Sequence, residues 1–88
     1  HIRCNAVLPG MTETEAVKNN LSEDFRNLFL RHIPLSKIGQ PEEIGAAVVY
    51  FASDESAYTT GQILAISGGF GLATPIYGDV KSSNTSRA

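Results

Sequence analysis

The chain has 88 residues, a mass of 9.4 kDa, 42% hydrophobic residues and a formal net charge of −2. Its seven basic and nine acidic residues are scattered, so they give no electrostatic footprint for nucleic acid. No apolar run approaches the roughly 20 residues that a membrane span needs, and a single cysteine excludes an intrachain disulfide. We therefore expect a small cytoplasmic chain with no nucleic-acid, membrane or metal partner.

The first element predicted is a strand over Ile2–Leu8, closed by the turn signal Pro9-Gly10. Its apolar composition is typical of a parallel strand that is covered on both faces, and it makes Cys4 a small core residue. Neither an initiator Met nor a signal segment precedes this run. We expect the chain to begin inside a domain, as part of a longer protein.

Two helices are predicted next. Thr12–Asn20 is polar and compatible with a helix, and Thr12 with Glu15 has the spacing of a capping box. Ser22–Arg31 is a second helix, because Ser22 suits the N-cap and acidic residues fill the first turn. Its apolar stripe consists of Phe25, Leu28, Phe29 and His32.

The clearest helix begins at Pro41, which fits the first helical position. Its apolar residues follow the spacing i, i+3, i+4, i+7 and are Ile44, Ala47, Val48 and Phe51. Gln62–Ile66 is a second strand, stopped by Gly68-Gly69. The order strand, helices, strand predicts an α/β fold with a parallel sheet, whose two strands need further neighbours.

Four stretches together carry a family resemblance: residues 2–10, 33–44, 51–56, and 60–63 with 68–69. In this order and spacing, the chain resembles the C-terminal third of a short-chain dehydrogenase/reductase. The resemblance implies the last two strands, the substrate-loop helices and the final helix of a doubly wound Rossmann-type sheet. Residues 1–80 would form this part of one NAD(P)-binding domain, and the polar residues 81–88 a disordered tail.

The resemblance also implies a cofactor, NAD or NADP, bound at Pro9, Gly10, Thr12 and Thr14. In the family, the residue at the position of Thr12 offers backbone groups to the nicotinamide carboxamide, and the Thr at position 14 contacts cofactor. Gly10 would let the backbone approach the nicotinamide ring closely. The alternative interpretation of the same residues is a plain turn followed by a helix cap at Thr12.

No residue of the chain is assigned a catalytic or a metal-binding role. The family's proton donor is a Tyr in a helical Tyr-x-x-x-Lys pattern, upstream of the Pro-Gly strand. Tyr77 and Lys81 match that spacing, but Pro75 and Gly78 disfavour a helix there. Gly69-Phe70-Gly71 is rejected as a dinucleotide fingerprint, because no helical pattern follows it.

Two hypotheses of function remain. In the first, the chain belongs to an NAD(P)-dependent oxidoreductase acting on a small alcohol or carbonyl substrate, and Met11–Arg31 (the lid segment) covers that substrate. Its apolar side chains, which could line the substrate or simply pack, are Met11, Val17, Leu21, Phe25 and Leu28. In the second, the chain is a non-catalytic piece that acts by association, since the family is commonly a homo-oligomer, a dimer or tetramer. The contact residues would be Val48, Val49, Tyr50, Ile63 and Leu64.

Overall fold

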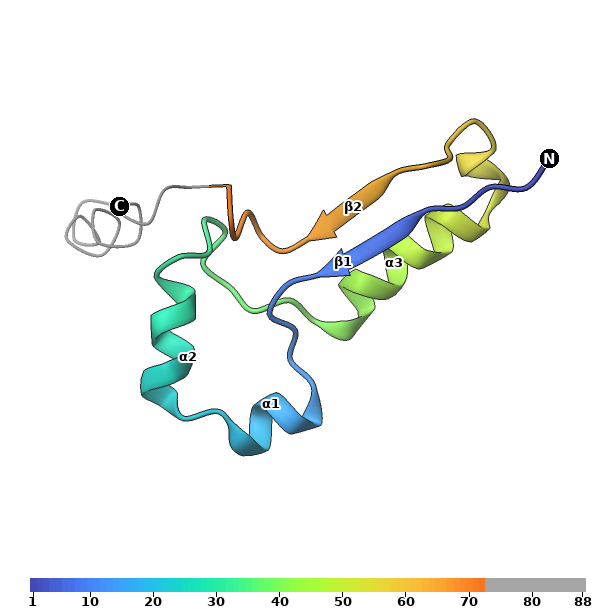
Figure 1. Ribbon diagram of the computed structural model, residues 1–88. Coiled ribbons are helices and arrows are strands. Elements are labelled where there is room, and N and C mark those ends of the chain that lie inside the picture. The colour runs from blue at the N-terminus through green and yellow to red at the C-terminus, as the bar shows by residue number, and fades with distance from the viewer. Residues whose placement is uncertain (73–88) are drawn as a thin grey trace.

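The computed structural model describes residues 1–72, so the predictions on Tyr77, Lys81 and the tail 81–88 lie outside the described residues. The elements in chain order are β1 (Ala6–Pro9), α1 (Glu15–Asn20), α2 (Glu23–Leu30), α3 (Pro41–Ala52), the 3-10 helix η1 (Asp54–Ser56) and β2 (Ile63–Ile66). This order confirms the predicted α/β class (Figure 1). Within residues 1–72, every helix is too short or too polar to cross a membrane.

The two strands are parallel neighbours, as predicted, with Ala6 opposite Ile63 and Pro9 opposite Ile66. Both arrows in Figure 1 point toward the end of the molecule where α1 and α2 lie. The carboxyl ends of β1 and β2 therefore meet at one edge of the sheet, which is where ligands bind in open parallel sheets.

The first strand is shorter than the predicted Ile2–Leu8, because side chains before Ala6 fix the chain to a loop. The Asn5 side-chain amide donates to the Thr59 carbonyl at 3.1 Å, and its oxygen accepts from the Gln62 N–H at 3.0 Å. Cys4 lies beside this loop and is exposed, so the prediction of a core cysteine is wrong.

Helix α3 begins at Pro41, as predicted, and the Glu43 carboxylate accepts from the Gln40 N–H at 3.1 Å. The helix contacts both strands and covers one face of the sheet (Figure 1). On the opposite face, Leu8 is 59% and Ile63 is 74% exposed. The expected covering of both faces is thus not provided by residues 1–72.

A part-buried polar contact joins the residues before β1 to η1 and to the end of α3. Ser56 is fully buried, and its Oγ accepts from Arg3 Nη1 at 2.8 Å. The same nitrogen donates to the Phe51 carbonyl at 3.1 Å, which is one of the carbonyls left without an intrahelical partner at the helix end. Arg3 thereby fixes the helix to the strand at the end of the sheet away from the lid segment.

The core at the other end is centred on Ile33, which is 1% exposed. Gly68 has a φ of +64°, and a Cβ there would lie 2.8 Å from Ile33 Cγ2. A Cβ on Gly69, whose φ is +94°, would lie 2.9 Å from Pro34 Cγ. The two glycines therefore let the chain after α2 pack closely on the turn that follows β2.

The two short helices have the hydroxyl caps that favour their start. Thr14, not Thr12, is the N-cap of α1, and its Oγ1 accepts from the Val17 N–H at 3.2 Å. The predicted capping box at Thr12 is wrong because Thr12 pairs instead with Gly39 in an isolated parallel bridge. Ser22 caps α2, as predicted.

Candidate functional site

The lid segment begins at a backbone junction that we call the lid stem, formed by Met11–Glu13 and Gly39. The Glu13 N–H donates to the Gly39 carbonyl at 2.7 Å, and the Gly39 N–H donates to the Met11 carbonyl at 3.0 Å. Consecutive residues of an extended chain direct their N–H and C=O groups to alternate sides, so those of Thr12 face away from Gly39. Within residues 1–72 the Thr12 N–H has no hydrogen-bond partner, and its carbonyl accepts from the Thr14 N–H at 2.9 Å.

Gly10 lies where the carboxyl ends of the two strands meet. Its N–H donates to the Ile66 carbonyl at 2.9 Å, next to Pro9 at the end of β1. A Cβ on Gly10 would lie 2.8 Å from both Cα and Cβ of Ser67. Glycine is therefore required here for the approach of two backbone segments, a physical reason different from the ring contact that the sequence indicated.

The four residues predicted to bind cofactor, Pro9, Gly10, Thr12 and Thr14, form one run from the end of β1 to the start of α1. The Thr12 hydroxyl donates to the Gly10 carbonyl at 3.0 Å and so stiffens the run between them. Thr14 is exposed, and its hydroxyl keeps its own hydrogen for a further acceptor while it caps α1. Beside this run is a hollow of about 220 Å³, lined by Met11, Leu35, Lys37, Gly39, Glu43, Ile66, Ser67 and Gly68.

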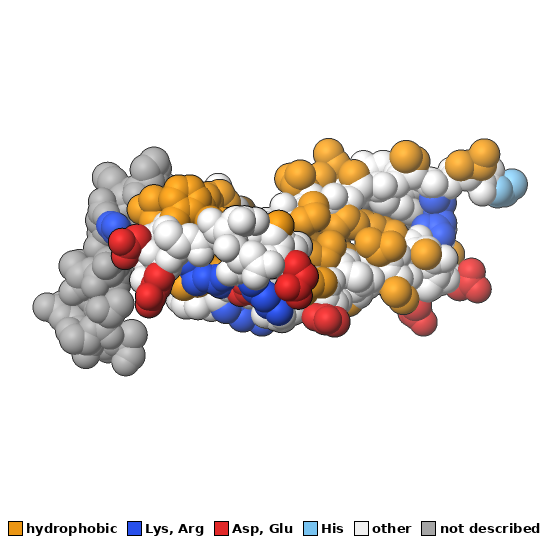
Figure 2. Space-filling view, turned by 90° about the horizontal axis from the view of Figure 1, so that it is seen from below, with side chains coloured by type: hydrophobic (Ala, Val, Ile, Leu, Met, Phe, Trp, Pro, Cys, Tyr) orange, Lys and Arg blue, Asp and Glu red, His pale blue; other side chains and the backbone are white. Residues whose placement is uncertain are grey.

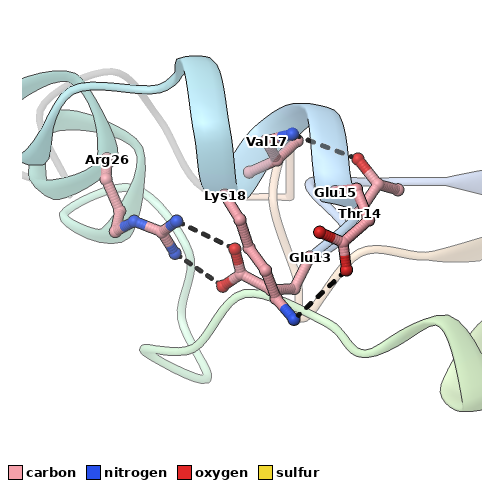
Figure 3. Close-up of polar contacts among 6 residues, drawn as sticks. All are labelled: Glu13, Thr14, Glu15, Val17, Lys18 and Arg26. Atoms are coloured by element: carbon pink, nitrogen blue, oxygen red, sulfur yellow. Dashed lines mark hydrogen bonds and ion pairs between the residues drawn. The ribbon is translucent and has the colours of Figure 1, made fainter.

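Sequence reasoning missed an ion pair inside the lid segment, between Glu13 and Arg26 (Figure 3). Arg26 Nη1 and Nη2 donate to the two carboxylate oxygens of Glu13 at 2.6 and 2.8 Å. These hydrogen bonds, and more weakly the charges of Arg26 and Lys18, lower the pKa of Glu13, while the carboxylate raises the pKa of Arg26. Opposite charges 13 residues apart have no helical spacing, so no local pattern indicates the pair.

The apolar side chains of the lid segment are divided between packing and exposure. Met11, Val17 and Leu21 are half-buried, whereas Phe25 and Leu28 on α2 are 48% and 47% exposed. In Figure 2, charged side chains gather over the part of the molecule that holds α1 and α2, and hydrophobic ones over the sheet and α3. Helix α2 thus presents a partly open apolar edge.

Comparisons with known proteins agree with this architecture. Residues 1–71 match a family model described as enoyl-(acyl carrier protein) reductase. The chain is 52% identical over 79 residues to 7alpha-hydroxysteroid dehydrogenase of Clostridium sardiniense. This match covers 90% of the chain and 30% of that protein. It is 42% identical over 69 residues to 3-oxoacyl-[acyl-carrier-protein] reductase of Chlamydia trachomatis, over 78% of the chain and 27% of that protein.

Two solved structures are also similar. A hydroxysteroid dehydrogenase from Escherichia coli has a TM-score of 0.74 and 35% identity, over 77% of this chain and 28% of that one. A 7alpha-hydroxysteroid dehydrogenase complexed with NADH and 7-oxo glycochenodeoxycholic acid also has a TM-score of 0.74 and is 34% identical. The match covers 80% of this chain and 28% of that one.

Fold and matches together define a chain of the Rossmann-type α/β class. The chain belongs to the short-chain dehydrogenase/reductase family, and the predicted resemblance is confirmed. It spans about 30% of the length of the curated relatives it matches.

Proposed function

We propose that this chain forms the nicotinamide-side loop and the substrate lid of an NAD(P)-dependent dehydrogenase that interconverts a secondary alcohol and a ketone on a hydroxysteroid. The observation that carries the cofactor part is the Thr12 backbone, whose N–H is left open beside the carboxyl ends of both strands. A carboxamide offers both an acceptor and a donor. The Thr12 N–H and the second lone pair of its carbonyl match those two groups.

The fit assigns separate tasks to the residues of the site. Thr12 would hold the nicotinamide carboxamide through its backbone, and the exposed Thr14 hydroxyl would donate to another part of the cofactor. When bound, the nicotinamide supplies or accepts the hydride. The lid segment would exclude water and orient the carbon that is reduced or oxidised, and no residue of this chain is assigned the proton transfer.

The hydroxysteroid class is supported by two features. The relatives that are 52% and 49% identical are both 7alpha-hydroxysteroid dehydrogenases, from Clostridium sardiniense and Paraclostridium sordellii. Phe25 and Leu28 present an exposed apolar edge on α2, which would suit a large apolar ring system better than a small polar substrate.

The proposal can be tested in a chimera, in which this chain replaces the matching part of the Clostridium sardiniense enzyme. Proline at position 12 removes the N–H, whereas valine keeps it. We expect Thr12→Pro to weaken NADH or NADPH binding about tenfold, the equivalent of one hydrogen bond of about 1.4 kcal/mol. Thr12→Val should change binding by less than about twofold, since the contact is made by the main chain.

Fluorescence titration gives the cofactor affinities, and turnover of a 7-oxo steroid against a 3-oxoacyl thioester gives the substrate class. Equal affinities for both Thr12 variants and the parent chimera would contradict the assignment of Thr12. Faster turnover of the thioester would replace the steroid by an acyl chain as substrate class.

A second proposal, association without catalysis, is favoured by the exposed apolar side chains of α3 and β2. Val49 is 68% and Ile63 is 74% exposed in the described structure. In this proposal the 88-residue chain docks on a complete subunit of its family and performs no chemistry. Co-sedimentation of the chain with an intact subunit, lost on Val49→Glu, would support it, and independent sedimentation of the two would contradict it.

A further inference from the structure

The lid helices have little packing to hold them in place. Neither α1 nor α2 contains a buried residue, and within residues 1–72 neither packs against another helix or a strand. The lid segment is attached to the sheet through the lid stem at its start, and around the end of α2 through the close packing of Ile33 and a ring contact of 5.9 Å between Phe29 and Phe70. The stem and α2 are separate points of attachment, and a contact between them fixes the angle at which α2 lies.

The Glu13–Arg26 pair joins those two parts directly (Figure 3). Glu13 belongs to the lid stem, because its N–H donates to the Gly39 carbonyl at 2.7 Å. Arg26 lies on α2, and its planar guanidinium meets the carboxylate with two parallel hydrogen bonds. A bidentate contact fixes orientation as well as distance, and the side chains of Arg26 and Glu13 are only 25% and 15% exposed. The ion pair thereby connects α2 back to the lid stem across α1, which lies between them in the chain.

We propose that Glu13 and Arg26 are a positioning pair that fixes α2 over the substrate, so that substrate affinity depends on the pair and cofactor affinity does not. The inference rests on the proposed function, because it needs a substrate beneath the lid segment. Phe25 and Leu28, the exposed apolar side chains of α2, lie on either side of Arg26 in the sequence. A change in the orientation of α2 would therefore displace both of them.

The structure offers a matched control in the neighbouring pair of Glu15 and Lys18. Their charged atoms are 3.9 Å apart, both lie within α1, and the side chains are 85% and 55% exposed. Such a contact adds little and connects nothing beyond one helix. Glu15→Gln removes the same charge as Glu13→Gln, two residues away, without releasing α2.

The experiment compares Glu13→Gln, Arg26→Gln, the double variant and Glu15→Gln in the chimera. We expect each single variant of the pair to raise the KM of the 7-oxo steroid about fivefold or more, with kcat and NADH affinity changed less than about twofold, as for a lost positioning contact. The double variant should be no worse than either single variant, because both remove the same contact. Glu15→Gln should match the parent.

The proposal is overturned if Glu13→Gln matches Glu15→Gln, if the two single effects multiply in the double variant, or if cofactor affinity falls with KM unchanged. If the parent chimera does not turn over the steroid, the proposed function fails, and hydrogen exchange then decides on the pair. Faster exchange in residues 15–30 of the Glu13→Gln chimera, with α3 unchanged, would support a device that holds the lid segment. Unchanged exchange there would overturn it.

Discussion

Alanine at position 10 would place a Cβ 2.8 Å from both Cα and Cβ of Ser67. One of these atoms belongs to the backbone, so the ends of β1 and β2 must separate. Inserting a carbon into a filled space costs about 1–3 kcal/mol. At about 2–4 °C per kcal/mol for a protein of 150–250 residues, Gly10→Ala should lower the Tm of the chimera by roughly 2–12 °C.

The control for this variant is Gly45→Ala, because a Cβ on Gly45 meets nothing within 4 Å and the residue lies inside α3. Alanine there should stabilise the helix by about 0.5–1 kcal/mol. The Tm of each variant is measured by circular dichroism at one scan rate. The NADH affinity of each variant is measured in a separate titration. An unchanged Tm for Gly10→Ala, together with a selective loss of NADH affinity, would refute the reasoning and return Gly10 to the role of admitting the nicotinamide ring.

Four further predictions follow from contacts, exposed surface and the roles assigned to the residues. Ser56→Ala should destabilise the chimera in urea by about 1–3 kcal/mol, because it removes a buried acceptor of Arg3; a loss no larger than that of Ser53→Ala would contradict this. The lowered pKa of Glu13 makes the contribution of its ion pair complete above the ordinary glutamate pKa, about 4.3, and lost as the pH falls through the lowered value. The Tm difference between Glu13→Gln and parent should therefore be constant from about pH 5 to 8 and vanish only in acid. The 88-residue chain alone should oxidise no NADH or NADPH, because none of its residues is assigned the proton transfer, and turnover with a carbonyl above a blank would contradict this. Finally, the chain alone should show no cooperative melt, given the exposed sheet face at Leu8 and Ile63; a sharp two-state melt of a monomer would count against it.

Local signals in the sequence were sufficient for the starts of α2 and α3. Pro41 with an apolar spacing of i, i+3, i+4, i+7 placed the start of α3, and Ser22 placed the start of α2. Both depend on contacts within one or two turns, which the order of residues determines directly.

The errors occur where distant residues compete for the same backbone. Strand β1 begins at Ala6 and not at Ile2, because Asn5 bonds to a loop more than 50 residues away. Thr12 does not cap a helix because Gly39 bonds to its neighbours. The proposed cofactor-binding run was indicated only by resemblance to a family, and the feature that supports it, the open N–H of Thr12, depends on that same distant partner.

The lid stem has a consequence for how substrate range can be exchanged within the family. Both backbone bonds of the stem are made to Gly39, so residues 14–38 leave and rejoin the sheet through a junction that uses no side chain. A segment of different length or sequence that keeps Ile33 and Pro34 packed on Gly68 and Gly69 can therefore be transplanted between those two points without altering the register of β1 and β2. If the proposed function holds, hybrid enzymes cut at positions 13 and 39, with Glu13 matched to an arginine in the incoming segment, should change the substrate while the proposed cofactor run is kept intact.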